Sequence, residues 1–375
     1  MDIIRIPLAP SPAGQAMTDN TAHPPAAAQP LAAAQAEKTP AGVPPVDFST
    51  VSPSAAAQKA SDAVPPSPPR DPARKNTIAL GFFDGMHRGH AALLSAALTL
   101  AAESGTVPAA FTFADHAALK PGRARLFSEE ERLARLSAAG MARLFLADFP
   151  ALRDKDVGAF ARLLAVDCCA AAVVCGFDFR CGRGAAAGPA ELSAALAPYG
   201  VSLRTLPTVR TPDGRPVSAS RVRAAMEEGQ PEEAAAVLGR PFSLTGPVLH
   251  GHALGRTLAF PTANLAFPPG GVLPARGVYA VAVAPGVALT LPPAPLVGMA
   301  NVGVRPTVAD GTGPNCEVHL FDFSGDLYGK TLTVFFLHRL RPERRFPDTD
   351  ALRAQLTTDK QMIKEYFRTW ENGQN

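Results

Sequence analysis

Two histidines spaced three residues apart stand in the segment GFFDGMHRGH, residues 81–90. The apolar run before this segment predicts a buried strand, and the alanine- and leucine-rich run after it predicts a helix. The histidines therefore fall on a strand-to-helix turn, where free backbone N–H groups and the helix dipole favour an anion. Imidazoles of His87 and His90 point the same way on a first helical turn and can donate to phosphate oxygens during phosphoryl transfer. A metal pair is a weaker alternative, because no third ligand stands at a suitable spacing.

A second dense segment, GRTLAFPTANL, covers residues 255–265. A turn at Gly255 and Arg256 could present backbone N–H groups and a cation to phosphates. Thr262 and Asn264 are oxygen donors separated by one residue, so in an extended segment both share a face and can reach one hard cation such as magnesium. An ordinary Pro-Thr turn explains any single pair of these residues but not the whole run.

The first segment resembles the signature of the HxGH nucleotidyltransferases, and more closely that of prokaryotic bifunctional riboflavin kinase/FAD synthetases. VCGFDFRCG (174–182) and VSASRVR (217–223) resemble two further motifs of that family. The resemblance implies that His87 and His90 contact ATP phosphates with no covalent intermediate. It also implies a set of nucleotide-binding residues, namely Gly81, Phe83, Asp84, Gly85, Gly89, Asp178, Ser218, Ser220 and Arg221.

The second half of the chain resembles the riboflavin kinase part of the same family. Its motifs are GRTLAFPTAN (255–264), NVGVRPT (301–307), CEVHLFDF (316–323) with DLYGK (326–330), and RPERRF (341–346). The resemblance implies that Thr262 and Asn264 bind Mg2+ and that Glu317 is the general base for the ribityl hydroxyl. It further assigns nucleotide binding to Gly255 and Arg256, and flavin binding to Arg341, Glu343 and Phe346. The expected activity is phosphorylation of riboflavin by ATP to FMN, followed by adenylylation of FMN by a second ATP to FAD.

Several positions depart from the family pattern. Residues 112–117 lack both usual prolines, Cys181 replaces an aromatic residue, and Ala219 and Ser220 replace a serine and a threonine. Two alternatives therefore remain: a riboflavin kinase with a weakened adenylyltransferase, and a flavin-binding regulator without catalysis.

Strands and helices alternate after residue 76 and predict a parallel α/β sheet of Rossmann-like type. The expected strands are 77–81, 107–113, 143–147, 171–175 and 201–206, and the expected helices are 88–103, 128–140, 156–165 and 190–198. Ligands bind beyond the carboxyl ends of such strands, where the histidine turn lies. From residue 239, short β-like runs without crossover helices predict a small antiparallel barrel, closed by a helix over about 350–370. The predicted domains are thus an adenylyltransferase, 76–238, and a riboflavin kinase, 239–375.

Residues 1–75 are dominated by alanine and proline, which predicts a disordered tail. The net charge of the 375-residue chain is +3, without a Lys/Arg run, so nucleic acid is not expected as a partner. No apolar run approaches the ~18 residues of a membrane span, and no signal peptide is apparent, so we expect a cytoplasmic protein without membrane contacts. The expected small-molecule partners are riboflavin, FMN and ATP. The sequence leaves homo-oligomerisation open.

Overall fold

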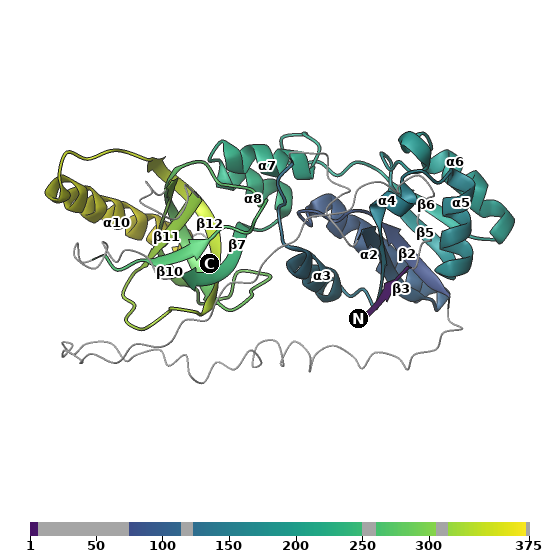
Figure 1. Cartoon of the computed structure of the whole chain (residues 1–375), viewed down its shortest axis with the longest axis horizontal. Helices are drawn as coiled ribbons and strands as arrows, with labels where there is room; N and C mark the ends of the chain where they lie inside the picture. Colours follow the sequence, from purple (N-terminus) through teal and green to yellow (C-terminus); the bar gives the residue numbers. More distant parts are fainter. Residues whose placement is uncertain (7–74, 114–122, 250–259, 305–313, 373–375) are drawn as a thin grey trace, which may run out of the picture.

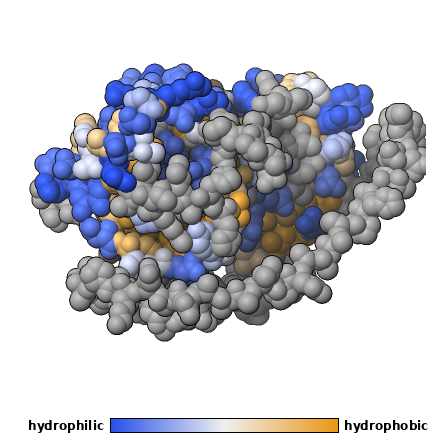
Figure 2. Space-filling model, turned by 60° about the vertical axis from the view of Figure 1, so that its left-hand side comes forward, coloured by the Kyte–Doolittle hydropathy of each residue, from blue (hydrophilic) through white to orange (hydrophobic). Residues whose placement is uncertain are grey.

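The computed structural model describes residues 1–6, 75–113, 123–249, 260–304 and 314–372. It has two domains, a parallel α/β sheet and a closed β-barrel, with two short helices between them (Figure 1). Figure 2 shows one face of the molecule, on which hydrophilic residues dominate the upper surface and apolar residues are visible lower down. No helix of the described ranges is long and apolar enough to cross a bilayer.

The first domain is built on a six-stranded sheet in the order β1-β4-β3-β2-β5-β6, with all neighbours parallel. Its strands are β1 (Asp2–Arg5), β2 (Asn76–Leu80), β3 (Val107–Phe113), β4 (Arg143–Ala147), β5 (Ala170–Gly176) and β6 (Ser202–Leu206). The five strands expected after residue 76 are all confirmed within one or two residues.

Strand β1 corrects the prediction that residues 1–75 lack structure. Asp2–Arg5 pair in parallel with Arg143–Leu146 of β4, and the side chain of Ile6 is buried beneath the sheet edge. The run Ile3-Ile4-Arg5-Ile6 has the β-branched residues of a strand. The proline-rich composition that follows it hid this signal. Residues 7–74 of the predicted tail lie outside the described residues.

Helices cover both faces of the sheet and make two cores. They are α2 (Arg88–Ser104), α3 (Glu129–Ala138), α4 (Phe149–Leu152), α5 (Val157–Arg162), which continues as a π-turn over Leu163–Asp167, and α6 (Pro189–Leu196). Neighbouring residues of β2 point to opposite faces, as a strand requires: Ala79 joins the core under α2, whereas Ile78 and Leu80 join the core under α5 and α6.

The second domain is a closed six-stranded antiparallel barrel in the order β10-β11-β8-β7-β12-β9. Its strands are β7 (Phe242–Leu249), β8 (Ala263–Ala266), β9 (Gly277–Pro285), β10 (Leu296–Val304), β11 (Pro314–Leu320) and β12 (Thr331–Pro342). The predicted barrel is confirmed. The C-terminal helix α10 (Thr349–Asn372) buries Ile363 and Phe367 against the outside of β9 and β12, as its apolar stripe predicts.

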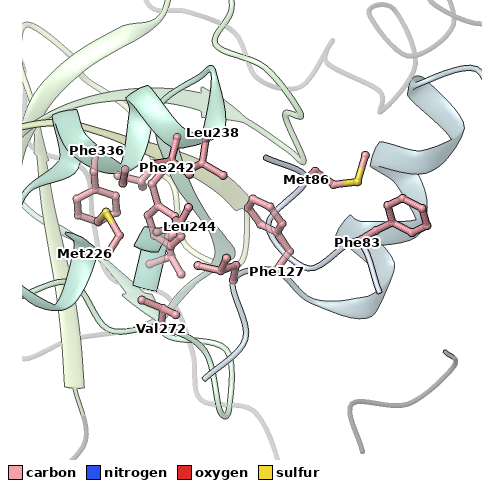
Figure 3. Close-up of a cluster of buried hydrophobic side chains, with 14 of the residues drawn as sticks. Phe83, Met86, Phe127, Met226, Leu238, Phe242, Leu244, Val272 and Phe336 are labelled. Atoms are coloured by element: carbon pink, nitrogen blue, oxygen red, sulfur yellow. The ribbon is translucent and has the colours of Figure 1, made fainter. Parts of the chain in front are cut away.

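Helices α7 (Ala219–Glu227) and α8 (Pro231–Leu238) pack on each other and carry the chain from the sheet to the barrel. Side chains from both domains form one continuous core in this region, which Figure 3 shows in part. Phe127 lies between Phe83 and Met86 on one side and Phe242 and Leu244 on the other. Its ring stacks on that of Phe242 with centroids 6.5 Å apart.

Candidate active sites

The histidine turn joins β2 to α2 at the carboxyl end of the sheet. His87 is the N-cap of α2, and its Nδ1 accepts a hydrogen bond from the backbone N–H of His90 at 3.4 Å. The two rings stack with centroids 3.8 Å apart and planes 15° from parallel. A Cβ at Gly89 would lie 3.1 Å from the His87 ring, so glycine leaves the room that this ring occupies.

Both histidines are neutral at physiological pH. Burial lowers the pKa of His87 to about 4, opposed by the charge of Asp178 and assisted by that of Arg240. Burial, followed by the charges of His87 and Arg240, lowers the pKa of His90 well below its usual value. Because Nδ1 of His87 accepts a hydrogen bond, its single proton is on Nε2, which is therefore a neutral donor for a phosphate oxygen.

Other predicted residues of this turn pack in the protein interior next to the histidines. Phe83 is fully buried, and its ring centroid lies 5.3 Å from that of His90. A Cβ at Gly81 would lie 3.0 Å from the Phe83 ring, and one at Gly85 would lie 2.6 Å from Leu126. The Phe83 side chain thus packs against the His90 ring in the protein interior.

Asp84 is also turned inward. It forms a buried ion pair with Arg223 of α7, and its Oδ1 accepts from the backbone N–H of Leu126 at 3.2 Å. The carboxylate therefore ties the turn to α7 and does not face the open end of the sheet. Asp178 is exposed on the turn after β5 and lies close enough to His87 to raise its pKa.

The serine and arginine cluster lies at the start of α7. Ser218 caps this helix by accepting from the backbone N–H of Arg221 at 3.2 Å, and Ser220 is exposed. Arg221 donates to Glu233 at 2.5 Å and to Thr211 at 2.7 Å. A phosphate contact by Arg221 would have to compete with these partners.

An aromatic pocket of about 560 Å³ opens at the carboxyl ends of β2, β3 and β5, and the sequence analysis did not predict it. Its lining includes Phe82, Phe111, Phe113, Phe149, Phe160, Phe179, Arg153, Arg180 and Cys181. The signal was present, because Phe82 and Phe149 closely follow predicted strands. The altered position Cys181 lies in the wall of this pocket, while residues 114–117 of the altered segment lie outside the described residues.

Arg132 of α3 fixes the mouth of this aromatic pocket. The side chain is 1% exposed and donates to the carbonyls of Phe82 at 3.0 Å and Phe113 at 2.6 Å, and to Thr112 Oγ1 at 2.5 Å. It thus clamps the ends of the two central strands, and its guanidinium lies 5.0 Å from the centre of the Phe82 ring. Sequence analysis missed Arg132 because nothing in its helical context marks it.

The barrel brings Asn264 and Glu317 together. They are direct partners in the antiparallel pairing of β8 with β11. Asn315 lies between them: its Nδ2 donates to Glu317 Oε1 at 2.7 Å and to Asn264 Oδ1 at 3.4 Å. Asn315, which the sequence analysis did not select, orients both predicted residues. Asn264 is buried, whereas Glu317 stays partly accessible. Such access is what the general-base role implied by the family resemblance requires.

His319 holds the segment that carries Thr262. Its Nδ1 lies 2.9 Å from the carbonyl oxygen of Pro261, and since a carbonyl only accepts, this nitrogen carries the proton. Burial is the main cause that lowers the pKa of His319. Beside this segment a second pocket, of about 310 Å³, is lined by Thr262 together with Asp326, Leu327 and Tyr328 of the following loop.

The oxygen donors of the barrel suit a hard cation. Thr262 lies on the rim of the second pocket, and the oxygens of Asn264 and Glu317 lie within reach of the same Asn315 amide. Neutral oxygens with a single carboxylate are typical of Mg2+ sites that are completed by substrate phosphates. Among the described residues, no group of three or more His, Cys, Asp or Glu side chains is placed so that it could hold a metal ion. Gly255 and Arg256, predicted to bind nucleotide, lie outside the described ranges.

The predicted flavin residues lie at the end of β12 and after it. Arg341 forms a two-point ion pair with Asp359 of α10, with N···O distances of 2.6 and 3.0 Å, and its guanidinium lies 5.9 Å from the Phe346 ring centre. The Glu343 carboxylate lies over Gly303 of β10, where a Cβ would be 2.6 Å from it. Arg341 thus anchors α10, and Glu343 faces the strand next to the one that carries Glu317.

Comparisons with known proteins agree with this two-site architecture. Residues 70–221 match the FAD synthetase family, and residues 238–367 match the flavokinase (riboflavin kinase) family. A crystal structure described as a macrolide-efflux protein from Streptococcus pneumoniae is similar over 79% of this chain and 95% of its own, with a TM-score of 0.68 and 30% sequence identity.

Curated bacterial relatives cover both domains. The bifunctional riboflavin kinase/FMN adenylyltransferase of Escherichia coli K12 is 34% identical over 304 residues, covering 77% of this chain and 92% of the relative. The enzymes of that description from Listeria monocytogenes and Bacillus subtilis are 31% and 30% identical, each covering 93% of the relative. The chain belongs to the bifunctional riboflavin kinase/FMN adenylyltransferase family.

Proposed function

We propose that the barrel phosphorylates riboflavin with ATP to FMN and that the α/β domain then transfers AMP from a second ATP to FMN, giving FAD and pyrophosphate. The observation that carries this proposal is the presence of two separate sites in one chain. One has neutral histidine donors beside an aromatic pocket, and the other has a carboxylate beside oxygen donors.

In the barrel, Glu317 takes the proton of the ribityl hydroxyl as this oxygen attacks the γ-phosphorus of ATP. The amide of Asn315 fixes the Glu317 carboxylate in place. Thr262 and Asn264 would hold Mg2+, which would supply positive charge against the phosphates. The second pocket, with Tyr328 in its wall, lies beside these groups and fits a substrate.

In the α/β domain, the aromatic pocket fits the isoalloxazine ring of FMN, because aromatic side chains stack on flat rings. Arg153 and Arg180 in its wall suit the FMN phosphate. His87 and His90 then face the α-phosphate of ATP and donate to its oxygens as charge develops in the transition state. The bond to pyrophosphate breaks as the FMN phosphate oxygen attacks the α-phosphorus. No covalent enzyme–nucleotide intermediate is needed.

A product assay tests this proposal. Purified protein is incubated with riboflavin, ATP and Mg2+, and the flavins are separated. FMN together with FAD supports the proposal. If only FMN forms, the departures at 112–117, 181 and 219–220 have weakened the adenylyltransferase. If neither FMN nor FAD forms, the result favours the alternative of a flavin-binding regulator without catalysis. Supplying FMN directly distinguishes a weak second step from a missing first one. We further propose that the protein acts in the cytoplasm, without nucleic acid or membrane partners; homo-oligomerisation stays open.

A further inference from the structure

Arg240 connects the barrel side of the molecule to the histidine turn. It stands in the short link between α8 and β7, within the stretch that matches the riboflavin kinase family. Its side chain nevertheless reaches back into the α/β domain. Nη2 donates to the carbonyl of Gly85 at 3.0 Å, and Nη1 donates to the carbonyl of Met86 at 2.8 Å.

These two carbonyls belong to a part of the turn with left-handed backbone conformation. Gly85 has φ +84°, and Met86, which is not a glycine, has φ +44°. A left-handed conformation is unfavourable for a side chain such as that of Met86 and persists only when its surroundings enforce it. The next residue is His87, so the direction of these two peptide units sets the position of the imidazole.

Arg240 packs beside side chains that are themselves held by further contacts. Its guanidinium lies 5.4 Å from the centre of the Phe127 ring, the same ring that Arg135 contacts at 4.3 Å. Arg135 is itself fixed by Glu131 at 2.6 Å and by the carbonyl of Leu289 in the barrel, also at 2.6 Å. Figure 3 shows Phe127 at this junction, between Met86 and Phe242.

The charge of Arg240 also acts on the imidazoles. Burial lowers the pKa of Arg240 to about 9, so this residue remains a cation at physiological pH. Its charge contributes to the lowered pKa of both His87 and His90, whereas Asp178 acts in the opposite direction on His87. A protonated His87 beside a buried guanidinium is unfavourable, which helps to keep the ring neutral.

We propose that Arg240 is a positioning residue for FAD formation: from the kinase-matched half of the chain, it holds the Gly85 and Met86 carbonyls and thereby orients His87. The proposal rests on the proposed role of His87 in adenylyl transfer. It makes the adenylyltransferase site dependent on a residue beyond its own sheet. The two halves are therefore coupled physically at this point, and not merely joined in sequence.

Two variants separate the contribution of the two-point hydrogen bonding by the Arg240 guanidinium from the contribution of its charge. Arg240→Met removes both, whereas Arg240→Lys keeps the charge and loses the two-point contact. For Arg240→Met we expect kcat of FAD formation from supplied FMN to fall by about 10–100-fold, since small misplacements of catalytic groups have effects of this size. KM for ATP should change less. FMN formation from riboflavin should stay within about twofold of the wild type in both variants.

The matched control is Arg339→Met. Arg339 also donates to a backbone carbonyl, that of Arg276 at 2.6 Å, and packs at Gly229 between α7 and α8, but does not contact the turn. FAD formation by this variant should match the wild type. An equal loss in Arg240→Met and Arg339→Met, or unchanged FAD formation in Arg240→Met, overturns the proposal.

A second readout is independent of turnover. Histidine resonances of the full chain, followed by NMR during a pH titration, should show the pKa of His87 rising in Arg240→Met and staying low in Arg240→Lys. If the wild type makes no FAD, the proposed adenylyl transfer fails, yet this titration still decides whether Arg240 sets the environment of His87. An unmoved His87 resonance and pKa in Arg240→Met would overturn the inference.

Discussion

Glu317 tests the chemistry of the barrel most directly. It is partly accessible and held by Asn315 at 2.7 Å, so Glu317→Gln keeps the shape and removes the base. A positioned general base contributes about 10²–10⁴-fold, and FMN formation should fall by that factor. FAD formation from supplied FMN should persist. Glu365→Gln, which removes an exposed carboxylate from α10, is the control and should leave both rates unchanged. Equal loss of both reactions in Glu317→Gln would identify a structural residue instead.

His90 tests the chemistry of the first domain. Because its ring stacks on His87 and contacts Phe83, His90→Ala would remove volume as well as a donor. His90→Phe fills the space without an N–H, and His90→Asn restores a donor. We expect FAD formation to fall by roughly 10²–10³ in His90→Phe and to recover in part in His90→Asn. Kinase activity should survive in both. FAD formation at the wild-type rate in His90→Phe would rule out the phosphate-donor role.

The buried histidines also make stability depend on pH. The pKa of His87 is about 4 in the folded protein and about 6.5 when unfolded, so between these values the unfolded chain binds more protons. The stabilisation is complete above pH 6.5 and is lost as pH falls towards 4. From pH 7 to 5 we expect His87 to account for about 2 kcal/mol of lost unfolding free energy. Urea unfolding at both pH values should show a smaller loss in His87→Gln than in the wild type. Equal losses would contradict this environment for His87.

Among the secondary-structure elements, β1 is expected to contribute to stability, whereas the segment 7–74 that follows it is not. Removing residues 1–74 deletes the strand that pairs with β4. It also exposes the apolar surface against which the Ile6 side chain is buried. We expect the free energy of unfolding to fall by about 1–3 kcal/mol, which is the contribution of burying one isoleucine side chain. Replacing only residues 7–74 by a Gly/Ser linker of about twenty residues, which can span about 65 Å, should preserve the thermal midpoint. If the truncation and the linker replacement lower the thermal midpoint equally, the segment 7–74 contributes to the stability of the fold.

Most elements could be predicted from the sequence because their signals are local. The strands of the α/β sheet are short apolar runs bounded by turn residues, and α3 opens with Ser128, whose side chain accepts from Glu131 N at 3.1 Å. Residue types and spacing also selected His87, His90 and Asn264, whereas Glu317 was assigned only through the resemblance of CEVHLFDF to the family motif. Pairing across the barrel then brought Asn264 next to Glu317, as the proposed chemistry requires.

The features that sequence reasoning missed depend on contacts between distant residues. Arg132 clamps the ends of β2 and β3 from a helix that looks ordinary in sequence. Arg240 reaches the histidine turn across 154 positions of the chain. Asp84 and Arg221 have the expected positions, but their side chains face Arg223 and Glu233. Partners of this kind follow from tertiary packing, which no local pattern encodes.

The molecule as a whole is held by a core that crosses the domain boundary. Buried side chains run without interruption from Phe83 and Leu94 of the α/β domain, through Phe127, to Phe242 and Phe336 of the barrel (Figure 3). The buried Arg135–Glu131 pair adds a hydrogen bond to the barrel carbonyl of Leu289. Inter-domain contacts of this apolar kind restrict relative motion of the domains. We therefore expect the two domains to unfold together.

Calorimetry of the wild type should then show a single transition whose calorimetric and van't Hoff enthalpies agree. Phe127→Ala removes the ring that joins the two halves, at a cost of about 3–5 kcal/mol, and should split the transition or broaden it. Phe367→Ala is the matched control, because Phe127 and Phe367 are both 4% exposed. Phe367 packs between α10 and the barrel. Phe367→Ala should therefore lower the stability of the protein while the α/β domain and the barrel still unfold in a single transition. Two resolved transitions in the wild type would show that the shared core does not couple the domains. Arg240 would then hold the histidine turn through its own hydrogen bonds alone, without the support of a cooperative interface.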